Sequence, residues 1–228
     1  MRRALFFVVL LAPAMVWSQS QQPQGSRFDL TLTVGYRMGG DIRIEERAVR
    51  PGDYVTDLAS SGALGLRLGY ALSDTFRLEF IGDRQGTRLM DNQGLFGEEP
   101  GSFVPPGNTS ILDVTLTNYH LGLTWDLTTG PSRWYLAGSV GVTDIRWNLP
   151  LPNDRPISAS LGGGVRLEMS PRLWILFEAR GFWVNTDEGL HGTVEFENED
   201  CGETCYITFR YDNSIVQSEL TVGLFIRF

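Results

Sequence analysis

Apolar and polar residues alternate along the last ten residues of the chain, 219–228. Successive side chains of a β-strand point to opposite faces, so this alternation predicts a strand whose two faces meet different surroundings. One face would be apolar: Leu220, Val222, Leu224, Ile226 and Phe228. If that face lies in lipid, every backbone polar group of the strand must be paired, which for strands requires a closed barrel.

Seven earlier segments alternate in the same way. They span 28–38, 63–72, a run that starts at Phe76, about 112–127, about 134–142, 157–169 and 172–184. With the last strand they make eight, an even number, at about ten residues each, the length that a tilted strand needs to cross a bilayer. The pattern therefore predicts an all-β fold, a membrane-spanning antiparallel up-and-down β-barrel of eight strands.

The connections between these segments alternate in length. Three are short turns at 73–75, 128–132 and 170–171, and four are longer polar links at about 41–62, 90–111, 147–156 and 185–214. Bacterial membrane barrels have short periplasmic turns and longer exterior loops. Aromatic residues near the short-turn end match the expected interfacial belt: Tyr70, Trp125, Trp134 and Phe228. A soluble β-sandwich or lipocalin-like barrel is the alternative, but it would bury the apolar face and leave the aligned charges unexplained.

The first 18 residues have the features of a secretory signal peptide. Arg2 and Arg3 supply the positive charge, and the apolar run 4–16 precedes a cleavage position ahead of Gln19. An uncleaved membrane anchor is the alternative. Residues 19–26 would form a short periplasmic tail, and residues 27–228 a single barrel domain.

Charge and composition narrow the possible partners. The formal net charge of −8 argues against nucleic acid as a partner, because phosphates would be repelled. All 19 basic residues are arginines. The planar guanidinium group suits fixed pairs with carboxylates.

Six short motifs follow one another in an order that resembles a known family. They occupy 35–40, 72–79, 119–122, 160–165, 178–181 and 223–228. Their order is similar to that in small eight-stranded bacterial outer-membrane barrels of the OmpA, OmpX and OmpW types. The resemblance implies a Gram-negative outer-membrane protein, monomeric, surrounded by membrane lipid and lipopolysaccharide. It also implies that the barrel-assembly machinery reads the C-terminal signal formed by Leu224, Ile226 and Phe228.

Charged residues occur on the face that would line the barrel interior. They are Arg37, Arg67, Arg77, Glu79, Asp83, Asp126, Arg166, Glu168, Glu178 and Arg180. The interior of an eight-stranded barrel is just wide enough for side chains to fill, and buried charges must be paired there. Pairing of neighbouring strands would place Arg67 diagonal to Glu79. These residues predict a salt-bridged structural plug, and a gated ion path is the alternative.

The link 185–213 is acidic and contains both cysteines. In an oxidising compartment Cys201 and Cys205 are expected to form a disulfide. A zinc site would need more Cys or His than the nearby His191 offers. The carboxylates lack the regular spacing of a calcium loop, so a solvated loop is the simpler interpretation, although they could hold divalent ions. We predict no metal and no cofactor.

Signals for catalysis are weak. His120 is predicted to face the lumen, and the serine that outer-membrane lipid A deacylases carry two residues after their histidine is replaced here by Gly122. His191 could join Asp187 and a loop serine, but no motif fixes that geometry. The sequence therefore favours a non-enzymatic barrel with a role in envelope integrity or surface interaction. A narrow porin-like channel is the alternative, and a lipid-modifying enzyme comes third.

Overall fold

The computed structural model describes residues 27–46, 52–91, 109–148, 154–186, 190–197, 204–211 and 214–228. Within these ranges the regular elements are twelve β-strands. We find no helix in the described ranges with the length and hydropathy needed to cross a membrane. The predicted signal peptide and periplasmic tail lie outside the described residues.

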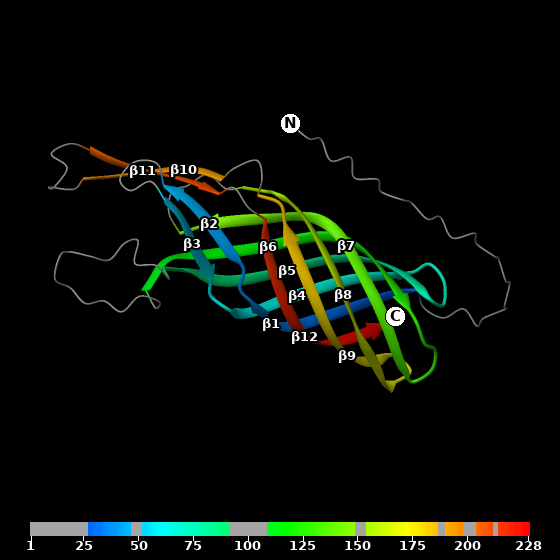
Figure 1. Ribbon diagram of the computed structural model, residues 1–228. Helices are drawn as coiled ribbons and strands as arrows, with labels where there is room; N and C mark the ends of the chain where they lie inside the picture. Colours follow the sequence, from blue (N-terminus) through cyan, green and yellow to red (C-terminus); the bar gives the residue numbers. More distant parts are fainter. Residues whose placement is uncertain are drawn as a thin grey trace.

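Eight strands form a closed antiparallel barrel (Figure 1). In barrel order they are β1 (Phe28–Met38), β4 (Ser61–Ala71), β5 (Phe76–Asp91), β6 (Thr109–Asp126), β7 (Ser132–Trp147), β8 (Ile157–Ser170), β9 (Leu173–Val184) and β12 (Ile215–Arg227). The first and last strands close the ring, with Val34 opposite Val222. The predicted fold class is confirmed, and no edge of the barrel is left for lipid to meet.

Alternation separates the two faces of the barrel wall as predicted. Outward apolar side chains are exposed, for example Leu64 at 67% and Leu161 at 74%, whereas the inward Phe225 is 1% exposed. Aromatic residues pair on neighbouring strands near the short turns, where the ring centroids of Phe28 and Tyr70 lie 5.0 Å apart. The outer surface is therefore an apolar belt suited to lipid, with aromatic side chains toward its short-turn end.

Two of the predicted long loops contain regular structure, so that part of the prediction was wrong. The link 41–62 holds β2 (Asp41–Glu46) and β3 (Gly52–Leu58), and the link 185–214 holds β10 (Leu190–Glu197) and β11 (Thr204–Tyr211). These strands continue the barrel wall beyond the long-link end in the order β10-β11-β2-β3-β5 (Figure 1). Their charged residues resemble loop composition, but sheet pairing outside the membrane tolerates charge on a solvated face.

Two glycines allow the chain to bring β3 back against the barrel. A Cβ on Gly39 would overlap the carbonyl oxygen of Leu58, and a Cβ on Gly40 would crowd the carbonyl oxygen of Val216. The Leu58 amide donates a hydrogen bond of 2.9 Å to the Gly40 carbonyl oxygen. A side chain at Gly39 would therefore displace Leu58, and one at Gly40 would displace β12 at Ile215 and Val216.

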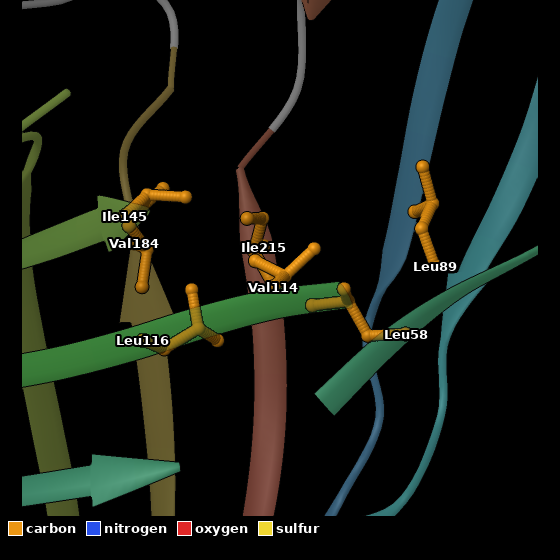
Figure 2. Packing of buried hydrophobic residues seen from close by; sticks show 7 residues of the cluster. All are labelled: Leu58, Leu89, Val114, Leu116, Ile145, Val184 and Ile215. Atoms are coloured by element: carbon orange, nitrogen blue, oxygen red, sulfur yellow. The ribbon is translucent and has the colours of Figure 1, made fainter. Parts of the chain in front are cut away.

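Leu58 belongs to an apolar cluster inside the long-link end of the barrel, which we call the apolar layer. Its members come from six strands and point toward one another (Figure 2): Leu58, Leu89, Val114, Leu116, Ile145, Val184 and Ile215. Each is 3% exposed or less. The layer places a small hydrocarbon core across that end of the lumen.

Candidate functional site: the closed lumen

Inward-facing side chains change in chemistry along the barrel axis. On β9 the inward positions run from Trp174 near the short turns, through Glu178 and Arg180, to Val184 near the long links, and all four are buried. Strands β5 and β12 repeat this change from aromatic or charged to aliphatic side chains. The lumen therefore has an ionic part near the short turns and the apolar layer at its other end.

Glu178 is the centre of the ionic part. Arg67 donates to both of its carboxylate oxygens at 2.8 and 2.7 Å, and Arg180 does so at 2.7 and 3.1 Å. The Tyr135 hydroxyl donates a fifth hydrogen bond of 2.8 Å. Two arginines on one carboxylate form a charge-assisted bidentate arrangement of the strongest kind. It joins β4, β7 and β9 across the lumen.

Arg37 forms a second ionic centre closer to the apolar layer. Its Nε donates to Glu219 at 2.6 Å, and its Nη2 donates to Asp83 at 2.7 Å. The Asn118 amide also donates to Asp83 at 2.7 Å. The guanidinium carbon lies 4.0 Å from the ring centroid of Phe182. This fully buried arginine thus ties β1 to β5 and β12.

Arg166 forms a third centre close to the short turns. Its Nη1 donates to Asp126 at 2.6 Å, and its Nη2 donates to Glu79 at 3.2 Å. Beside it, Nε of Arg77 lies 2.8 Å from an oxygen of Asp29. The three centres together pin side chains of most barrel strands, as buried charges require.

His120 lies among hydroxyl groups. Its Nδ1 is 2.8 Å from the Ser139 hydroxyl and its Nε2 is 2.8 Å from the Ser158 hydroxyl. Ser139 in turn contacts Ser160 at 2.6 Å. His120 is 1% exposed and Ser158 is fully buried. A histidine with both ring nitrogens engaged inside a packed lumen offers no open position for a substrate.

The predicted lumen charges lie inside the barrel with one exception. Glu168 lies opposite Trp174 at the end of β8, on the rim of the barrel, where it is exposed and forms no ion pair among the described residues. The expected ion pair of Arg67 with Glu79 does not form, because Arg67 pairs with Glu178 instead. Arg67 does lie diagonal to Glu79 in the register, yet its ion pair is with Glu178 across the lumen. Register alone could not show contacts that cross the barrel.

Three buried charges were missing from the predicted set. One is Asp144, which pairs with the exposed Arg146 and Arg155, and the other two are Asp29 and Glu219. Both pair with arginines inside the lumen, Asp29 with Arg77 and Glu219 with Arg37. Alternation along the first and last strands would have placed both inward. The apolar layer was also missed, although buried positions near the long-link ends of β5, β6, β7, β9 and β12 are aliphatic.

The acidic segment 185–213 is described only in part. His191 lies on β10 opposite Arg210, and Cys205 lies on β11, whereas Cys201 and Asp187 fall outside the described residues. The disulfide and any cation binding by this segment stay predictions. Within the described ranges no group of three or more His, Cys, Asp or Glu residues is arranged to hold a metal ion.

The residues of the C-terminal signal lie on the outer face of the closing strand. Leu224 is 40% exposed and Phe228 is 62% exposed, while Ile226 is half-buried. β12 is hydrogen-bonded to β1 on one side and to β9 on the other. Recognition of this ending by the assembly machinery stays a prediction.

Comparison with known proteins supports the fold. No protein-family model and no curated protein sequence matches the chain. Among solved structures it is similar to outer membrane protein OprG from Pseudomonas aeruginosa, with a TM-score of 0.56 and 13% identity over 90% of this chain and 98% of that one. This chain has the fold of a small outer-membrane β-barrel. Neisserial surface protein A is similar too, with a TM-score of 0.52 and 13% identity over 90% of this chain and 100% of that one.

Proposed function

We propose that this protein is an integral outer-membrane barrel with a sealed lumen, which serves envelope integrity or surface interaction through its exterior strands and loops. The observation that carries the proposal is the double closure of the interior. Five hydrogen bonds converge on Glu178 in the ionic part, and seven buried aliphatic side chains fill the apolar layer. An ion crossing the lumen would have to break fixed ion pairs and then enter hydrocarbon.

The exterior strands support a role outside the membrane. β2, β3, β10 and β11 extend the sheet beyond the long-link end, where a barrel of this orientation faces the surroundings of the cell. We propose outer-membrane lipid and lipopolysaccharide as neighbours of this end, and the barrel-assembly machinery as a transient partner of the C-terminal strand. The protein acts as a monomer without metal or cofactor.

A narrow conduit for ions or small solutes is the second candidate. Hydroxyl and amide groups continue the polar lumen beyond the ion pairs, with the Gln217 amide donating to Gln85 at 3.3 Å. Such a column can hold water. A conduit would require the apolar layer to open.

A lipid-modifying enzyme is the third and least favoured candidate. We propose that the protein has no enzymatic activity. His120 is enclosed by the hydroxyls of Ser139 and Ser158, so it lacks a path to substrate. A lipid-modifying activity would therefore have to use residues of the exterior segments.

Single-channel recording of the refolded barrel in a planar bilayer, with Cys201 and Cys205 kept oxidised, tests the proposal. We expect no reproducible current from the native protein. Discrete openings whose size changes in Glu79→Gln or Arg180→Gln variants would overturn the sealed barrel and favour the conduit.

A further inference from the structure

Four arginines gather around two aromatic side chains at the short-turn end of the lumen. The guanidinium carbons of Arg77, Arg166 and Arg227 lie 4.9, 5.4 and 5.8 Å from the ring centroid of Phe225. Those of Arg133 and Arg227 lie 5.0 and 5.8 Å from the ring of Trp174. We call these residues the mouth cluster: Arg77, Arg133, Arg166, Arg227, Trp174 and Phe225.

Unlike the Glu178 centre, the mouth cluster contains buried side-chain donors that have no hydrogen-bond acceptor. Of the seven buried side-chain nitrogen or oxygen atoms without a hydrogen-bond partner in the described part of the chain, Nε of Arg77 lies 2.8 Å from an oxygen of Asp29, and four of the other six lie at this end. They are Nη1 of Arg77, Nε of Arg166, Nε1 of Trp174 and Oγ1 of Thr124, which lies opposite Arg77 in the β5–β6 register. None belongs to Arg67, Arg180 or Tyr135. Buried donors without acceptors are costly, so this concentration calls for an acceptor.

The charge balance around the mouth cluster is positive, which also favours an acceptor. Its four arginines face three buried carboxylates: Asp29, Glu79 and Asp126. Arg227 is half-buried and forms no ion pair within the described ranges. The other side-chain carboxylates at this end, Asp74 and Glu168, are exposed and form no ion pair among the described residues. One positive charge is therefore left without a buried counter-charge.

Access is from the side of the short turns. Arg133 and Arg227 are partly exposed there, the Arg133 side chain at 22%, whereas Arg77 and Arg166 lie deeper and are almost fully buried. The guanidinium groups of these two outer arginines lie over the ring of Trp174, and the indole N–H of Trp174 has no hydrogen-bond partner among the described residues. An anion entering this end would first meet the partly exposed guanidinium groups and then the buried N–H donors, an arrangement suited to an oxyanion.

We propose that the mouth cluster binds the phosphate group of a small anion or lipid headgroup from the periplasmic side, through Arg227, Arg133 and the indole N–H of Trp174. Guanidinium groups match the geometry of phosphate oxygens, and the neutral indole donor adds a directed hydrogen bond. The site lies on the periplasmic side of the Glu178 centre, so its occupation leaves the lumen closed.

The test is a titration of the full-length refolded barrel with inorganic phosphate in phosphate-free alkyl glucoside micelles, followed by calorimetry at low ionic strength. We expect saturable binding that weakens at least about tenfold in Arg227→Gln and by a smaller factor in Trp174→Phe, since each good charge-assisted contact is worth roughly tenfold or more in affinity. Arg172→Gln, an exposed arginine on the neighbouring turn, is the matched control and should bind like the native chain. Glu168→Gln should bind equally or more tightly, because a repelling carboxylate is removed.

A second arm separates a soluble ion from a lipid. The same chains are refolded in neutral phosphatidylcholine bilayers with and without phosphatidylglycerol, and their unfolding midpoints are compared. Saturation by inorganic phosphate that depends on Arg227 identifies a soluble anion. Stabilisation by phosphatidylglycerol alone that depends on Arg227 identifies a headgroup. If neither ligand distinguishes Arg227→Gln and Trp174→Phe from Arg172→Gln, the site is overturned.

Discussion

The lumen is closed at two levels by opposite kinds of chemistry. Near the middle of the barrel Glu178 accepts five hydrogen bonds from Arg67, Arg180 and Tyr135, whereas at the long-link end Leu116 and Ile145 pack against other aliphatic side chains. The stability of the ionic part depends on the pairing of its charges, because the loss of one residue leaves its partners buried without a counter-charge. The stability of the apolar layer depends on the side-chain volume that fills it, so each truncation lowers stability in proportion to the volume removed. The difference separates a closure that fixes strand positions from one that excludes water.

Removal of the central carboxylate should have the largest effect. Glu178→Ala leaves Arg67 and Arg180 buried without their counter-charge, which should lower the free energy of unfolding by about 3–5 kcal/mol. Urea unfolding of the refolded barrel in lipid vesicles, followed by tryptophan fluorescence, measures it. Glu168→Gln is the control, because this exposed glutamate should change stability by less than about 0.5 kcal/mol. Similar losses in the two variants would show that Glu178 is not the centre of the network.

Truncation in the apolar layer should rank second. Ile145→Ala removes a fully buried side chain and should cost about 2–4 kcal/mol through lost burial and a residual cavity. Ile157→Ala changes an isoleucine that is 67% exposed on the outer face, and it provides the comparison in the same vesicles. If the inner variant loses no more stability than the outer one, the layer is not a packed core.

Loss of one donor to Glu178 should have a smaller effect. Tyr135→Phe keeps the ring, whose centroid lies 4.1 Å from the Arg166 guanidinium carbon, and removes only the hydroxyl. Glu178 retains its four hydrogen bonds from arginine, so we expect a cost of about 1–2 kcal/mol. A double-mutant cycle with Arg180→Gln measures the coupling between the two donors. A loss as large as that of Glu178→Ala would mean that the tyrosine carries the network.

A surface ion pair marks the lower end of the scale. Arg88 and Asp113 lie 3.3 Å apart on β5 and β6, and their side chains are 66% and 65% exposed. Asp113→Asn should therefore change the unfolding free energy by about 0.5 kcal/mol or less, and added salt should remove the difference. A cost comparable to that of Tyr135→Phe would contradict the dependence on burial.

The barrel itself could be predicted because alternation is local. Each of the eight segments shows its two faces within ten residues, and the first predicted strand, 28–38, agrees with β1 at both ends. The exterior strands were missed although β2 pairs with β3 and β10 with β11 as local hairpins, and only the pairing of β2 with β11 joins segments far apart in the sequence. Charged residues such as those of β2 also favour loops on composition alone.

Placement of the lumen side chains was predictable, but their partners were not. Inward positions follow from parity, which puts Arg67 and Glu178 on the same side of the wall. Their contact crosses the barrel interior between β4 and β9, which are not neighbours in the sheet. Glu168 is exposed because it lies at the rim of the barrel, at the end of β8 beside the short turn 170–171.

Thiol accessibility of the lumen between the two closures tests the sealed barrel most directly. Ser160 accepts a hydrogen bond from Arg180 and is 7% exposed, whereas Ser73 lies exposed in a short turn. In a chain carrying Cys201→Ser and Cys205→Ser, we would compare the labelling rates of Ser160→Cys and Ser73→Cys by a charged, membrane-impermeant maleimide added to both sides of the vesicles. The sealed barrel predicts rapid labelling of Ser73→Cys, with Ser160→Cys labelled only after unfolding in urea. Labelling of both variants at similar rates in the folded barrel would contradict it.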